Sequence, residues 1–148
     1  MATKLFVSIS LALALAASAI AQNPAAPDLS GKWVLNLAKS QMKGRNIHSE
    51  VIAIKYSGFK IKMSFTTDGK QSTEEYIADG KKRVVGTVDG RDVVQRAYWD
   101  GSALVTEISI RIDRLVGGSK TRWALSPDGR SLTCEWNDGE SVLVYDKQ

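Results

Sequence analysis

Apolar and polar residues alternate along most of the chain, which is the pattern of a β-strand with one buried face. The segment 59–66 shows this alternation most clearly. One of its faces carries Phe59, Ile61, Met63 and Phe65, and the other carries Lys60, Lys62, Ser64 and Thr66. A slip of one residue in strand pairing would exchange the two faces, so the pattern predicts a sheet of defined register with one face toward a core.

Asp-Gly pairs divide the alternating segments from one another. They lie at 68–69, 79–80, 89–90, 100–101, 128–129 and 138–139. Glycine, and to a lesser extent Asp, tolerates the positive φ of tight hairpin turns, so each pair predicts a chain reversal. Ser57-Gly58 predicts a further turn, and Gly117-Gly118 predicts a break in the one long interval between pairs.

The distance between turns leaves about eight residues for each strand, which is too short for a helical crossover, so consecutive strands are expected to pair antiparallel. The expected strands are 32–37, 47–56, 59–67, 70–78, 82–88, 91–99, 102–114, 119–126, 130–137 and 140–146. An all-β antiparallel meander of about 8–10 strands most simply removes its edges by curling into a closed or nearly closed up-and-down barrel. A bent open sheet or a sandwich is the alternative.

The first residues have the three parts of a secretory signal. Lys4 precedes an apolar run over 5–17, and Ala19-Ile20-Ala21 supplies a small-x-small cleavage site. The run is shorter than the roughly 20 residues of a membrane span. We therefore expect a signal peptide over 1–21, a flexible leader over 22–28 and one domain over 29–148, exported to the periplasm or medium, with no transmembrane segment after cleavage.

Composition excludes several classes of function. The formal net charge of +4 is spread along the strands, which does not predict a nucleic-acid surface. The chain has one histidine, His48, and one cysteine, Cys134, so we predict no metal site, no cofactor, no disulfide and no nucleophilic triad. Cys134 alternates with apolar residues and is expected to be a buried thiol.

Two groups of side chains are candidates for binding. The strand 70–78 is polar on both faces, so we expect a wet interior in which the candidate ligand-binding residues are Glu75, Gln95, Arg96 and Thr106. An exposed edge strand would explain the same polarity. A basic cluster formed by Lys81, Lys82, Arg83 and Arg91 is a candidate site for an anionic envelope component, or simply a solvated hairpin end.

The segment 29–40 reads Leu-Ser-Gly-Lys-Trp-Val-Leu-Asn-Leu-Ala-Lys-Ser. Its Gly-x-Trp resembles the opening of many lipocalin-like, or calycin-like, barrels. The longer pattern L-S-G-x-W-x-L-N-x-x-K-S resembles that of small exported bacterial proteins with a signal peptide and a run of Asp-Gly hairpins. The resemblance implies that Trp33 plugs one end of the barrel, that Gly31 permits a close approach, and that Arg122 or Lys147 stacks on the indole.

Three functions remain open at this point. The first is a non-enzymatic exported module that binds a small apolar or amphipathic molecule inside the barrel. The second is a filled barrel that serves as a structural or protein-interaction component of the cell envelope. The third and least favoured is a barrel isomerase or lyase that uses an interior acid such as Glu75.

Overall fold

The computed structural model describes residues 26–112 and 115–148. The predicted signal peptide and the first residues of the predicted leader lie outside this part of the chain. Within it, ten strands and one 3₁₀ turn follow one another. They are β1 (Gly31–Leu35), η1 (Leu37–Lys39), β2 (Glu50–Ser57), β3 (Lys60–Thr67), β4 (Lys70–Ile77), β5 (Arg83–Val88), β6 (Arg91–Asp100), β7 (Ala103–Ile112), β8 (Leu115–Leu125), β9 (Ser131–Trp136) and β10 (Ser141–Lys147).

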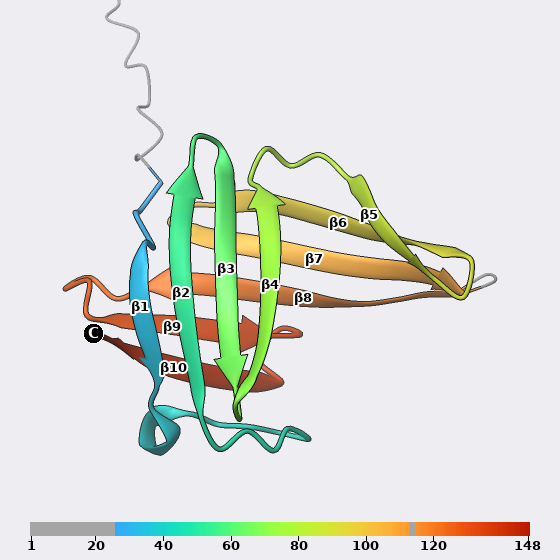
Figure 1. Ribbon diagram of the computed structural model, residues 1–148. Coiled ribbons are helices and arrows are strands. Elements are labelled where there is room, and N and C mark those ends of the chain that lie inside the picture. The colour runs from blue at the N-terminus through green and yellow to red at the C-terminus, as the bar shows by residue number, and fades with distance from the viewer. Residues whose placement is uncertain (1–25, 113–114) are drawn as a thin grey trace, which may run out of the picture.

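All the strands belong to one antiparallel sheet in the order β4-β3-β2-β1-β10-β9-β8-β7-β6-β5. This confirms the predicted all-β up-and-down meander, and the sheet curls into a half-barrel. Figure 1 shows β1–β4 as one wall, with β6–β10 crossing behind it at a steep angle. The first and last strands pair directly, with Trp33 opposite Lys147 and Leu35 opposite Tyr145. The free edges of the sheet are β4 and β5.

Hairpin turns form at five of the six Asp-Gly pairs. At 79–80 the expected pairing of consecutive strands is wrong, because β4 and β5 are the two free edges of the sheet. Asp68 and Gly69 have φ values of 46° and 80°, and Asp89 and Gly90 have values of 51° and 71°. Two consecutive positive φ angles are the mirror-image turn whose twist matches that of the strands it joins. The turns therefore hold the paired strands in register, apart from one register shift in β5 between Val84 and Gly86.

The Gly117-Gly118 pair does not break the chain as the sequence predicts. It lies inside β8, where Gly117 pairs with Ile110 and Gly118 with Ser109. A Cβ atom on Gly118 would lie 2.3 Å from the carbonyl oxygen of Ile108. Glycine is needed here because the two backbones approach closely, and the pairing of β7 with β8 continues past it to Ile112 and Leu115.

One end of the barrel is filled by apolar side chains around Trp33. The indole is fully buried, and its Nε1 donates a hydrogen bond of 2.9 Å to the carbonyl oxygen of Leu29. The ammonium of Lys147 lies 5.3 Å from the centre of the Trp33 ring system. A Cβ on Gly31, where φ is +131°, would lie 3.3 Å from Cε of Lys147. Glycine therefore leaves room for the lysine beside the indole.

The sequence predicted that Arg122 or Lys147 stacks on Trp33, and the structure shows Lys147 in that place. Arg122 pairs with Val105 on the outer face and forms an ion pair of 2.6 Å with Asp100. The strand register explains the difference, because β1 is paired with β10, whereas β8 lies two strands further along the sheet.

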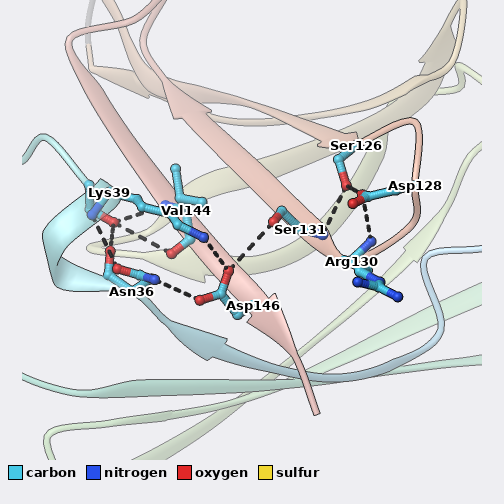
Figure 2. Close-up of polar contacts among 9 residues, drawn as sticks. Asn36, Lys39, Ser126, Asp128, Arg130, Ser131, Val144 and Asp146 are labelled. Carbon is cyan, nitrogen blue, oxygen red and sulfur yellow. Dashed lines mark hydrogen bonds and ion pairs between the residues drawn. The ribbon is translucent and has the colours of Figure 1, made fainter.

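The second half of the N-terminal motif fastens η1 to β10 (Figure 2). Asp146 accepts hydrogen bonds from Asn36 Nδ2 at 2.6 Å and from Lys39 Nζ at 3.1 Å. Ser40 Oγ donates to the Asn36 carbonyl oxygen at 2.7 Å and accepts from the Val144 amide at 2.9 Å. The Asn, Lys and Ser of the motif therefore hold the seam between the first and last strands.

A methyl group added at Gly118 is expected to separate β7 from β8. Gly118→Ala should lower the free energy of unfolding by about 1–3 kcal/mol, because the added carbon overlaps backbone atoms that cannot move independently. Urea denaturation measures this change. The matched control is Gly117→Ala, because a Cβ at Gly117 would meet nothing within 4 Å. Equal stability of the two variants would contradict the close approach.

Removal of the Asp146 charge is expected to weaken the seam in a pH-dependent way. A hydrogen bond from Asn36, and to a smaller extent one from Lys39, holds the pKa of Asp146 below its usual range. Because the folded-state pKa is the lower one, the stabilisation is present above the ordinary carboxyl pKa and is lost as the pH falls through the folded value. Asp146→Asn should lower the midpoint of thermal unfolding by a few degrees at pH 7 and by less at pH 3. The exposed Asp138→Asn serves as the control, and a pH-independent loss would contradict the assignment.

Candidate functional site

A polar cavity of about 250 Å³ lies inside the barrel. Its charged lining residues are Arg45, Glu50 and Glu74, and its hydroxyl groups come from Thr67, Ser72, Tyr76, Thr106, Ser119, Thr121 and Tyr145. The remaining wall is Phe65, Ile108, Trp123, Cys134, Trp136 and Leu143. These residues come from strands on both walls of the barrel, so the curvature of the sheet creates the cavity.

Glu50 is the most deeply placed charge in the cavity. Its side chain lies at the start of β2, and only 8% of the residue is exposed. Tyr145 of β10 donates its hydroxyl hydrogen to Oε1 at 2.5 Å, and Thr67 of β3 donates to Oε2. A buried carboxylate is tolerated when its oxygens accept such bonds. Glu50 thus ties three strands together and presents negative charge to the interior.

Two tyrosines act as hydrogen-bond donors to these carboxylates. Burial raises the pKa of Tyr145, and the nearby Cys134 and Glu50 raise it further. Burial also raises the pKa of Tyr76, with Glu74 contributing through its charge and through the hydrogen bond that it accepts from the Tyr76 hydroxyl. Both phenols therefore stay protonated at neutral pH, and both are already committed to a carboxylate within the wall.

Aromatic rings form the apolar side of the cavity. The rings of Phe65 and Trp123 lie 6.3 Å apart, centre to centre, at an angle of 46°. Trp123 Nε1 donates to Thr106 Oγ1 at 3.4 Å, which satisfies its buried polar atom. These rings give the cavity flat apolar surface in addition to the acidic side chains of Glu50 and Glu74.

Arg45 reaches the cavity from the segment between η1 and β2. Figure 1 shows this segment running along the lower edge of the sheet. It is anchored to β10 by Ser141, whose Oγ accepts from the Lys43 amide at 3.1 Å. The guanidinium carbon of Arg45 then lies 3.3 Å from the centre of the Trp136 ring system. Arg45 is half-buried, and its planar group is stacked on an aromatic face.

The cavity leads toward the gap between the free edges of the sheet. A second hollow, of about 510 Å³, lies between β4 and the β5–β6 pair and shares Glu74, Tyr76 and Ile108 with the cavity. Its other wall includes Val85 and Gln95. The unpaired edges thus leave a side opening next to the polar interior.

The four candidate ligand-binding residues from the sequence have different positions. Thr106 is buried and lines the cavity, and Gln95 is half-buried at the gap. Glu75 is exposed and pairs with Lys62 on the outer face, although it borders the gap. Arg96 also lies on the outer face, where it pairs with Glu107 at 3.6 Å and donates to the Gly80 carbonyl oxygen at 2.9 Å.

Strand parity explains this distribution. Tyr76 faces the core, so Glu74 points inward with it and Glu75 points outward. The structure brings Thr106 together with residues that the sequence analysis did not select, namely Arg45, Glu50, Glu74 and Tyr145. A signal for Glu50 was present in the sequence, because Glu50 has the same parity as the buried Ile52 and Ile54.

The predicted basic cluster is spread along β5, with Arg83 at the start of the strand and Arg91 across the turn at its end. Arg83 is held by Asp79, with contacts of 2.8 and 2.7 Å that lower the pKa of the Asp79 carboxyl. Lys82 and Arg91 line a separate groove on the outer surface. Arg83 borders the hollow beside β4, but no residue of the cluster lines the cavity itself.

Several other features bear on what the interior does. Burial raises the pKa of the Cys134 thiol, which keeps it protonated. Among residues 26–112 and 115–148, no group of three or more His, Cys, Asp or Glu side chains is arranged to hold a metal ion. Across the same residues, no helix has the length and apolar character needed to cross a membrane.

An open depression of about 880 Å³ lies on the surface at the opposite end of the barrel from Glu50. Its lining includes Pro27, Gly31 and Trp99.

Known structures share this fold. A fatty acid transporter named REP1-NXSQ is 19% identical, with a TM-score of 0.57 over 81% of this chain and 96% of the other. Apo Caenorhabditis elegans lipid binding protein 8 is 14% identical, with a TM-score of 0.61 over 81% of this chain and 95% of the other. Neither the protein-family models nor the curated proteins give a match. At these identities the similarity establishes a calycin-like barrel fold.

Removal of the Tyr145 hydroxyl is expected to destabilise the fold, because the buried Glu50 carboxylate then loses a hydrogen-bond donor. Tyr145→Phe removes the donor to Oε1 of Glu50 and leaves that oxygen without its partner. The free energy of unfolding should fall by about 1–3 kcal/mol, measured by urea denaturation. Tyr98→Phe is the control, because the Tyr98 hydroxyl donates to Glu107 at 3.1 Å on the outer face, where water can replace it. A smaller loss for Tyr145→Phe than for the control would contradict the role of Tyr145.

Proposed function

We propose that this chain is a non-enzymatic binding protein that holds a small amphipathic molecule in the cavity between its two walls. The observation that carries the proposal is that the cavity lining combines the acidic side chains of Glu50 and Glu74 with the aromatic rings of Phe65 and Trp123. A few oriented polar groups set against apolar and aromatic surface are characteristic of small-molecule sites.

Cavity size limits the ligand. A volume of about 250 Å³ is below the roughly 300–1,000 Å³ of sites for drug-sized molecules. The apolar end of the barrel cannot add to it, because Leu29, Trp33 and Leu104 fill that end without exposure. A compact molecule of one or two rings fits this space better than a long extended chain.

The fold supports a carrier rather than an enzyme. Two solved structures with this fold are named as a fatty acid transporter and a lipid binding protein. The inward hydroxyl groups of Tyr76 and Tyr145 are held protonated by raised pKa values and donate to carboxylates, so they serve as fixed donors. The side opening between β4 and β5 gives a path to the interior.

We further propose that the protein is exported after cleavage near Ala21, and that it is one of the small bacterial barrel proteins that its N-terminal motif resembles. The support is the pattern of residues 1–21 together with the motif at 29–40. A small-molecule carrier of this kind would act in the periplasm or outside the cell. The cluster at Lys82 and Arg91 would then face anionic components of the envelope.

A side chain that fills the cavity should abolish binding. Prodan, a neutral amphipathic naphthalene dye, reports entry into an apolar site by a blue shift of its emission. The unmodified protein should bind prodan saturably. Ser72→Phe should remove the blue shift, because Ser72 lines the cavity beside Phe65, its partner on the neighbouring strand. Gln71→Phe is the matched control, since it adds the same ring to the outer face of the same strand.

Three outcomes separate the functions. Loss of binding in Ser72→Phe alone supports an interior site. Equal binding by both variants would place the dye elsewhere and contradict the proposal. Absence of any saturable binding by the unmodified protein would favour a filled barrel with a structural or protein-interaction role.

A further inference from the structure

We infer that the cavity, if it holds a ligand as proposed above, selects a small amine over a carboxylate of the same shape. The ligand class is an ammonium group attached to an apolar body of one or two rings. The ammonium group would face Glu50 and Glu74, and the rings would lie against Phe65 and Trp123.

The balance of charge in the cavity favours a cation. Of the charged side chains that line it, two are acidic, Glu50 and Glu74, and one is basic, Arg45. Glu50 lies deepest, with 8% of its surface exposed, whereas Arg45 is half-buried. A charge acts most strongly where water is excluded, so the deep carboxylate determines the sign of the interior.

Arg45 is already engaged in the wall. Its guanidinium carbon lies 3.3 Å from the centre of the Trp136 ring system, the distance of a stacked cation–π contact. The segment that carries Arg45 is anchored to β10 through Lys43 and Ser141. Stacking fixes the guanidinium against Trp136, on a side chain that is less deeply buried than Glu50.

The hydrogen bonds of the wall leave acceptors for the ligand. Tyr145 and Thr67 donate to Glu50, and Tyr76 donates to Oε2 of Glu74. Among the residues that the structure describes, Oε1 of Glu74 accepts no hydrogen bond, and Glu74 is only half-buried. An ammonium group, which is a donor with three hydrogens, matches this oxygen.

A carboxylate ligand would meet the opposite arrangement. It would bring a third negative charge beside Glu50 and Glu74, and the half-buried Arg45 is the one positive side chain in the lining. Like charges close together in a site are strongly unfavourable. The aromatic faces attract a cation and offer no such attraction to an anion.

Three naphthalene compounds of equal shape test the preference by displacement of prodan. They are 2-(2-naphthyl)ethylamine, 2-(2-naphthyl)ethanol and 2-naphthylacetate, which carry positive, zero and negative charge. We expect the amine to bind at least about tenfold more tightly than the acid, with the alcohol between them. The dissociation constants are measured at pH 7 and low ionic strength.

Adjacent glutamates on opposite faces of β4 provide the variants. Glu74→Gln keeps the shape and the acceptor for Tyr76 but removes the inward charge, so it should reduce the amine-to-acid ratio several-fold. Glu75→Gln removes the same charge from the outer face and should leave the ratio unchanged. Circular dichroism confirms that both variants are folded.

The outcomes distinguish this inference from the binding function on which it rests. Saturable binding of all three compounds with equal affinity, or a preference for the acid, would overturn the amine preference and leave the binding function intact. Equal effects of Glu74→Gln and Glu75→Gln would also overturn it. Failure of prodan and all three compounds to bind would overturn the binding function and the preference together.

Discussion

The pairing of the first strand with the last is the constraint on which the rest of the structure depends. A single sheet has two faces, and it can bury one of them only by curling onto itself. Trp33 opposite Lys147 and Leu35 opposite Tyr145 join the ends of the chain into one continuous sheet. Asp146, held by Asn36 and Lys39, fastens the same junction from outside. Once the ends are joined, the free edges must lie elsewhere, at β4 and β5.

The two ends of the barrel differ because different residues occupy the inward positions. Around Trp33 these positions are apolar, and the side chains pack without space for a ligand. Toward the start of β2 and the end of β3 they are Glu50 and Thr67, whose polar atoms need partners and water. The polar end therefore keeps a cavity, and the free edge at β4 lies beside it. One sequence thus builds an apolar plug and a polar cavity within a single sheet.

Much of the fold could be predicted from local pattern. Alternation and Asp-Gly turns predicted ten strands close to those observed, because both features act over a few residues. The predicted break at Gly117-Gly118 was wrong, because the sequence does not distinguish a glycine that is needed for a turn from one that is needed where two backbones approach closely. The sequence did not show whether Lys147 or Arg122 lies beside Trp33, because this depends on which strand pairs with β1.

The candidate site was harder to predict than the fold. Glu75 and Glu74 are adjacent, and only the parity set by Tyr76 shows that Glu74 is the inward residue. Arg45 reaches the cavity from a segment with no alternation, so no pattern in the sequence places it near Trp136. The hydrogen bond between Glu50 and Tyr145 joins residues 95 positions apart, and it follows only from the closure of the sheet.

The four tryptophans allow the most direct measurement of where a ligand binds. Trp123 and Trp136 line the cavity, whereas Trp33 plugs the apolar end and Trp99 borders the open depression near Pro27. Titration of ¹⁵N-labelled protein with 2-(2-naphthyl)ethanol, followed through the four indole N–H resonances, reports on both regions at once. We expect saturable shifts at Trp123 and Trp136. Shifts confined to Trp99, or no shift at any of the four, would contradict this expectation.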